Sequence, residues 1–124
     1  MRGKLLAAAL GAIAAGIVLI PTSLGENVAR NLLGDGLVRA EIVAKRDGAI
    51  QVFRVDRGRV RAFNRAALTL KELDGSIVVV PITPATRFEI AGRPVGFALI
   101  RRGMWATTTR VGDEPAEHVL LVRR

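Results

Sequence analysis

The chain has 124 residues, a formal net charge of +8 at pH 7 and no cysteine. The lack of thiols excludes disulfides, thiolate metal sites, cysteine nucleophiles and lipid attachment through an N-terminal cysteine. The length favours one small domain, and the positive charge favours acidic partners such as phosphate polymers, anionic lipid headgroups or cell-wall polyanions.

Residues 1–25 have the pattern of a targeting segment. The basic start "MRGK" precedes an uncharged apolar run, Leu5 to Ile20, and the small residues of "TSLG" then precede a cleavage point before Glu26. The uncharged span 5–25 is also long enough to serve as a membrane anchor. Signal peptide and signal anchor stay open as alternatives. Both export the rest of the chain to a secreted or periplasmic location, because the basic N-terminus remains inside.

Residues 26–37 are expected to form a spacer between this leader and a β domain at 38–124. The spacer sequence "ENVARNLLGDG" favours a short helix, for which Gly34 suits the C-cap.

The pair Asp47-Gly48 predicts a two-residue hairpin turn. This turn sets a register that places apolar pairs on one face and opposite charges on the other: Ala40 with Val55, Ile42 with Phe53, Ala44 with Gln51, Glu41 with Arg54, and Arg39 with Asp56. A shift by one residue would destroy both patterns.

Three arginines, Arg57, Arg59 and Arg61, follow on the second strand of this hairpin. They alternate with small apolar residues, as expected for a strand that turns cations outward and Val60 and Ala62 inward. The three are candidates for an anion-binding site, and the alternative is a solvated strand face.

A second hairpin is predicted around Asp74-Gly75, with the apolar run Ile77–Val80 covered on both faces. The segment "RPVGFALIRRG" is the helical candidate, limited to one or two turns, with Pro94 in its first turn. Two closing strands are predicted in the segments "MWATTTRV" and "AEHVLLV". The expected fold is mainly β: a small antiparallel barrel or sandwich of about seven short strands and one short helix, preceded by the N-terminal apolar helix.

Residues 57–122 carry "GRVRAF", "LTLKELDGSIVVVPI", "TRF", "LIRRGMWATTT" and "AEHVLL" in that order. In this order of features the segment resembles a family of small exported bacterial β-barrel domains of unknown function. The resemblance implies an oligonucleotide-binding-like barrel and an extracytoplasmic location. It implies no activity and no site residues.

Catalysis is not expected, because the exported portion has one histidine, one serine, no cysteine and no tyrosine. The segment "GDEPAEH" together with Met104 is a candidate metal site, but one methionine and one histidine do not complete a soft ligand set. No catalytic residue, metal ligand or cofactor is therefore assigned.

The sequence thus predicts a non-catalytic, exported or membrane-tethered module of the cell envelope with a binding or structural role. One alternative is a periplasmic protein that binds a metal or small ligand. Another is a module that binds an anionic envelope polymer or lipid surface through the arginine-rich strand. Nucleic acid is not expected as a partner, since export removes most nucleic-acid ligands.

Overall fold

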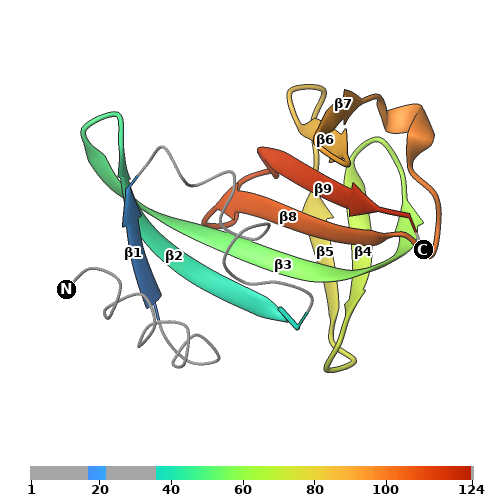
Figure 1. The fold of residues 1–124 in the computed structure, drawn as a ribbon, viewed down its shortest axis with the longest axis horizontal. Helices are drawn as coiled ribbons and strands as arrows, with labels where there is room; N and C mark the ends of the chain where they lie inside the picture. The colour runs from blue at the N-terminus through green and yellow to red at the C-terminus, as the bar shows by residue number, and fades with distance from the viewer. Residues whose placement is uncertain (1–16, 22–35, 124) are drawn as a thin grey trace.

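The computed structural model describes residues 17–21 and 36–123, and these are mainly β. The strands form one sheet in the order β1-β2-β3-β8-β9-β6-β7, with β4 paired to β3 and β5 paired to β4 (Figure 1). The strand bounds are β1 Ile17–Pro21, β2 Arg39–Arg46, β3 Ala49–Phe63, β4 Ala67–Glu72, β5 Ile77–Pro81, β6 Arg87–Ile90, β7 Arg93–Val95, β8 Trp105–Val111 and β9 His118–Val122.

Strand β3 is the central strand of the sheet. Its 15 residues pair with β2 along the first half, with β4 along the second half, and with β8 on the other edge. Figure 1 shows the consequence: the β2–β3 hairpin, with β1 beside β2, extends to one side of the molecule, and the other strands gather around the other end of β3.

The predicted register of the first hairpin is confirmed. Ile42 lies opposite Phe53 and Glu41 lies opposite Arg54, and the other predicted pairs also hold. Asp47 and Gly48 have φ angles of 53° and 78°. Positive φ at both central residues is the conformation that suits a two-residue turn between twisted strands.

The second predicted hairpin also forms, as β4 and β5, but the prediction that both faces of β5 are covered is wrong. Ile77 is 50% exposed and Val79 is 57% exposed, whereas Val80 is fully buried. Among the described residues β5 pairs only with β4, so it is an edge strand with one face toward solvent.

The sheet does not close into a barrel, which corrects that part of the expected fold. Strand β5 ends at Pro81 and the segment after it carries Pro84, and proline cannot donate a ladder hydrogen bond. A single backbone bond from Ala116 N–H to the Pro81 oxygen, 2.8 Å long, links the end of β5 to the approach to β9. The sheet is also mixed rather than antiparallel, because β6 runs parallel to β9 and β1 runs parallel to β2.

The predicted helix is shorter than expected. Only Phe97–Leu99 form a single 3₁₀ turn, and Pro94 belongs to β7 instead of the first helical turn. Gly96 takes an extended conformation before that turn, with φ −87° and ψ 165°. Its low helix propensity and its place between strand and turn explain why a longer helix does not form.

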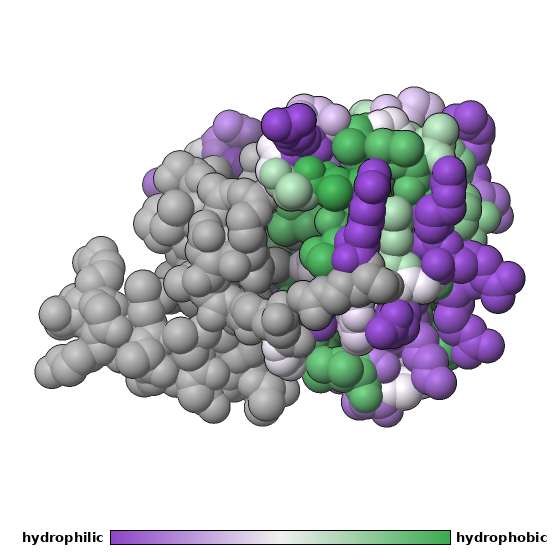
Figure 2. All heavy atoms as spheres, turned by 45° about the vertical axis from the view of Figure 1, so that its right-hand side comes forward, coloured by the Kyte–Doolittle hydropathy of each residue, from purple (hydrophilic) through white to green (hydrophobic). Residues whose placement is uncertain are grey.

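The main core lies between the β3–β4–β5 and β8–β9–β6 parts of the sheet. Its buried members are Val60, Leu68, Leu70, Val80, Ile82, Phe88, Ile100, Met104, Ala106, Ala116, Val119 and Leu121. Fully burying one such large side chain stabilises the fold by roughly 1.5–3 kcal/mol. Apolar surface also reaches the outside between purple charged side chains (Figure 2).

Gly58 lets β3 and β4 approach each other closely within this core. A Cβ atom at this position would lie 2.5 Å from the backbone oxygen of Lys71, which is a steric clash with main chain. Glycine is therefore required where the two strands meet.

The predictions for the N-terminal region remain predictions. Ile17–Pro21 form β1, while residues 1–16 and 22–35, and with them most of the leader and spacer, lie outside the described residues. In the part of the chain that the structure describes, no helix is long and apolar enough to cross a membrane.

Candidate anion-binding face

The predicted arginines lie beside the only tryptophan of the chain. In the pairing of β3 with β8, Arg59 lies opposite Trp105 and Arg57 lies opposite Thr107. The guanidinium carbon of Arg57 is 4.3 Å from the centroid of the Trp105 ring, and that of Arg59 is 4.9 Å from it. Both distances allow cation–π attraction, which is strongest with tryptophan.

Arg57 is not part of a solvated face. It is only 7% exposed, whereas Arg59 and Arg61 are exposed. The Trp105 ring covers its guanidinium group, so the expectation of three wet arginines on one strand is wrong at this position. Arg59 stays at the surface and donates a hydrogen bond of 2.9 Å to the backbone oxygen of Gly103.

A β-bulge changes the alternation at Arg61. Val60 pairs with Leu70 and Ala62 pairs with Thr69, so Arg61 is the extra residue of β3. Val60 points to the core as predicted, but Ala62 is exposed instead of buried. After the extra residue, the side chains of β3 point to the opposite face of the sheet from the one that strict alternation predicts. Strict two-residue alternation does not anticipate such a bulge.

Strand β4 adds a cation that the sequence reasoning did not select. Lys71 lies opposite Arg59, and the same row continues to Ile77 on β5, while on the other side Trp105 lies opposite Val122. The row thus crosses five neighbouring strands on one face of the sheet. Only strand pairing, not spacing along the chain, brings Lys71 beside the arginines.

We call the surface of Arg59, Arg61, Lys71 and Trp105 the Trp105 face. Trp105 is half-buried, and the three cations are exposed. Within residues 36–123, none of these three cations forms an ion pair with a carboxylate, in contrast to the arginines at 39, 46 and 54. The positive charge of this face is therefore not neutralised by the described part of the protein.

The opposite face of β3 carries a buried pair of acids that the sequence reasoning missed. Asp56 is 3% exposed and Glu72 is 4% exposed, and each has a buried oxygen without a hydrogen-bond partner among the described groups. Burial, followed by a hydrogen bond to Asp56, raises the pKa of Glu72 to about 7. A buried carboxyl group beside a second carboxyl group is favoured in its neutral form, and Glu72 is therefore the group that holds a proton here.

Arg39 joins this acid pair to the turn of the second hairpin. Its Nε donates to Glu72 over 3.1 Å, and its Nη2 donates to Ser76 Oγ over 3.1 Å and also to Asp74. The predicted register of Arg39 opposite Asp56 is correct, but its ion pairs go to Glu72 and Asp74. Likewise Arg54, placed opposite Glu41 as predicted, forms its ion pair with Asp113.

The residues considered for a metal site are separated by other contacts. Glu117 accepts two hydrogen bonds of 2.7 Å from Arg46, and His118 Nε2 lies 3.0 Å from the Glu89 carboxylate. Met104 is buried in the core. Within the described ranges no group of three or more histidine, cysteine or acidic side chains is placed to hold a metal ion.

No family model, curated protein or solved structure matches the chain. The resemblance to a family of exported β-barrel domains therefore stays a prediction.

Proposed function

We propose that this chain is a non-catalytic binding module of the cell envelope, and that its ligand is an anionic polymer bound on the Trp105 face. The export and envelope parts of the proposal rest on the N-terminal leader pattern. The choice of ligand rests on the exposed cations beside Trp105.

The observation that carries the proposal is the absence of acidic partners for Arg59, Arg61 and Lys71 in the described residues. Arg39, Arg46 and Arg54, by contrast, already form ion pairs with carboxylates. Exposed cations attract polyanions through charge that is not already compensated. The half-buried Trp105 ring adds a flat apolar surface against which a sugar or other ring can lie.

The arrangement of the cations favours a polymer over a small anion. Lys71 and Arg59 lie on neighbouring strands, which are separated by about 4.8 Å, and Arg61 lies farther along β3, where residues rise by about 3.3 Å each. Charges spread in this way over an open sheet face can contact successive anionic groups of a chain. They do not converge on one point as the ligands of a single phosphate would.

The test is binding of heparin, as an anionic polysaccharide probe, followed by the fluorescence of the single tryptophan. The variant Arg61→Gln/Lys71→Gln should lose roughly tenfold or more in affinity at low salt, since each lost cation contributes about 1 kcal/mol. Its affinity should also depend less steeply on salt, because fewer counterions are exchanged on binding.

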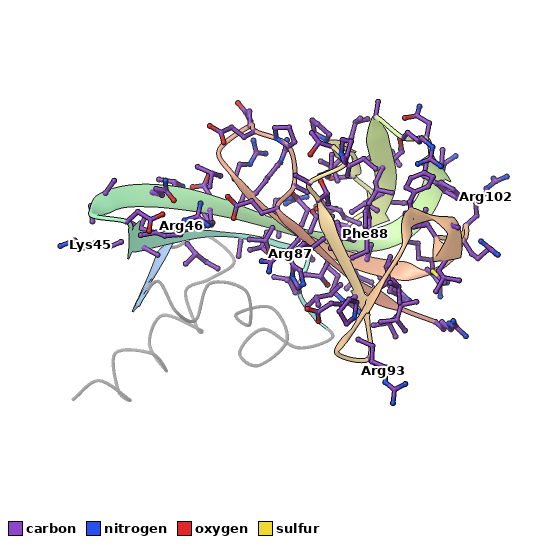
Figure 3. The ribbon with its side chains drawn as sticks, turned by 90° about the horizontal axis from the view of Figure 1, so that it is seen from above. Lys45, Arg46, Arg87, Phe88, Arg93 and Arg102 are labelled. Carbon is purple, nitrogen blue, oxygen red and sulfur yellow. The ribbon has the colours of Figure 1, made fainter. Side chains whose placement is uncertain are left out.

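The matched control removes two exposed cations elsewhere, Lys45 on β2 and Arg93 on β7, by substitution with glutamine. Figure 3 shows Lys45 on the extended hairpin and Arg93 at the lower side of the view, pointing away from the molecule. This control has the same net charge as the test variant. If both double variants lose the same affinity, or if the parent protein does not bind at low salt, the proposal is wrong.

A further inference from the structure

The outer edge of β5 has no neighbouring strand among the residues that the structure describes. Among the described residues β5 pairs with β4 alone. The Glu72 N–H donates to the Ser76 oxygen over 2.8 Å and so closes the hairpin. Hydrogen-bonded pairs then alternate along the ladder, so Val78 bonds to β4 while Ile77 and Val79 direct their N–H and C=O groups outward.

The side chains at the same positions are apolar and exposed. Ile77, Val79 and nearby Leu73 are all at least half exposed, and the sequence holds no charge from residue 75 to residue 86. Natural proteins usually protect an edge strand with charged residues, and this stretch has none. An uncharged edge strand that consists of β-branched residues favours pairing with another strand.

We infer that β5 pairs with β5 of a second copy of this chain, antiparallel and centred on Val78. In this register Ile77 of each copy lies opposite Val79 of the other. Both residues direct their backbone groups outward, so each such pair exchanges two N–H···O bonds. The side chains of Ile77 and Val79 from both copies then cover one another on the same sheet face.

Three features favour a second copy over a different partner. The register is self-complementary, as a two-fold dimer requires. The open segment around Val78 is bounded by the turn that ends at Ser76, two residues before it, and by Pro81, three residues after it, whose oxygen is bonded to Ala116. The strand itself also offers no charge with which to select a charged peptide.

Dimerisation in this register would join the Trp105 faces of both copies on one continuous sheet surface. In each copy Ile77 lies opposite Lys71, whose other neighbour is Arg59. Two such faces double the number of cations available to one polymer, which raises the avidity without new contacts. The inference about β5 does not depend on that binding and can be tested without a ligand.

The experiment is sedimentation equilibrium of the full chain over two decades of concentration. A short strand interface is small, so a weak, concentration-dependent dimer is expected. Val79→Pro removes an N–H that β4 does not use, in the same ladder position as the natural Pro81, and should abolish the dimer while the thermal unfolding transition is kept. Val79→Lys should also abolish it, whereas Val52→Lys on the other hairpin, where Val52 is 41% exposed, should not.

The register is tested with a single introduced thiol. Non-hydrogen-bonded antiparallel pairs have Cα atoms about 4.5 Å apart, within the range that a disulfide spans. Val78→Cys should therefore form a covalent dimer on mild oxidation, and Val52→Cys should not. A parent protein that is monomeric at every concentration overturns the inference, as does association that survives Val79→Pro and Val79→Lys, or equal cross-linking of both cysteine variants.

Discussion

The two hairpins of the sheet both turn at an Asp-Gly pair, but they turn differently. Asp47 and Gly48 both have positive φ and connect β2 to β3 directly. In the second hairpin only Gly75 has positive φ, at 89°, and the Asp74 side chain accepts a hydrogen bond of 3.0 Å from the Ser76 N–H. The same dipeptide therefore specifies a hairpin without specifying which turn it will form.

The hairpins differ also in what holds them to the rest of the sheet. The second one is fixed at two points: Gly58 of β3 meets the backbone of Lys71, and Arg39 of β2 binds Glu72 and Asp74. The first is bound by ion pairs from Arg46 and Arg54 to the segment between β8 and β9, but its tip residues, Ile50 among them, are exposed. Position in the sheet, rather than turn sequence, decides which hairpin is sensitive to substitution.

The largest effect is expected from Gly58→Ala. The added Cβ would meet the Lys71 backbone oxygen, and relieving this overpacking moves β4 relative to β3, at a cost of about 3 kcal/mol in the free energy of unfolding. Chemical denaturation measures the change. Gly96→Ala is the control, since a Cβ there has no atom within 4 Å and φ is negative. Equal losses in the two variants would contradict the close approach of β3 and β4.

The register of the first hairpin can be predicted from the sequence, whereas the contacts between strands that are distant in the chain cannot. The register from Arg39 to Asp56 follows from one turn and from the two-residue period, because a slip would bury charges. The bulge at Arg61, the stacking of Arg57 on Trp105 and the contact of Asp56 with Glu72 depend on which strands become neighbours. Local patterns carry no information on that choice when the partners are distant in the chain.

The next effect is a pH dependence that comes from Glu72. Its pKa in the folded protein, about 7, lies above the ordinary value of 4.5. The folded state therefore binds more protons, and the stability contributed by the protonated form is complete below about pH 4.5 and is lost as pH rises through 7. We expect the free energy of unfolding to fall by roughly 2 kcal/mol between pH 5 and pH 8 from this group.

Glu72→Gln should flatten that fall, because glutamine stays neutral at both pH values. Glu117→Gln is the control with the opposite sign. Hydrogen bonding to Arg46 lowers the pKa of Glu117, so its contribution is present above the ordinary carboxyl value and is lost as pH falls. Urea denaturation at several pH values measures both, and a Glu72→Gln protein with the parent slope would show that Glu72 does not hold the extra proton.

A smaller effect should separate the two turns. Asp47→Gly is expected to leave the melting temperature almost unchanged, since Gly-Gly also suits a two-residue turn with positive φ at both positions. Asp74→Gly should lower the melting temperature, because Asp74 accepts the Ser76 N–H and binds Arg39. These contacts also hold the pKa of Asp74 at about 2, with the Ser76 backbone bond as the first cause. Equal melting temperatures for the two variants would mean that the turns are equivalent.

The smallest effect is expected on the outer face of β5. Val79→Thr exchanges a methyl group for a hydroxyl at a position that is 57% exposed, so the unfolding free energy of the isolated copy should change by less than about 0.5 kcal/mol. The same substitution at the next residue, Val80→Thr, places that hydroxyl in a fully buried site and should cost about 1–3 kcal/mol. Denaturation at low protein concentration, where association is negligible, compares the two. The two variants differ only in the face of the sheet to which the substituted side chain points. A large loss of unfolding free energy for Val79→Thr would therefore mean that the outer face of β5 is covered within a single copy, and that the strand is not a free edge.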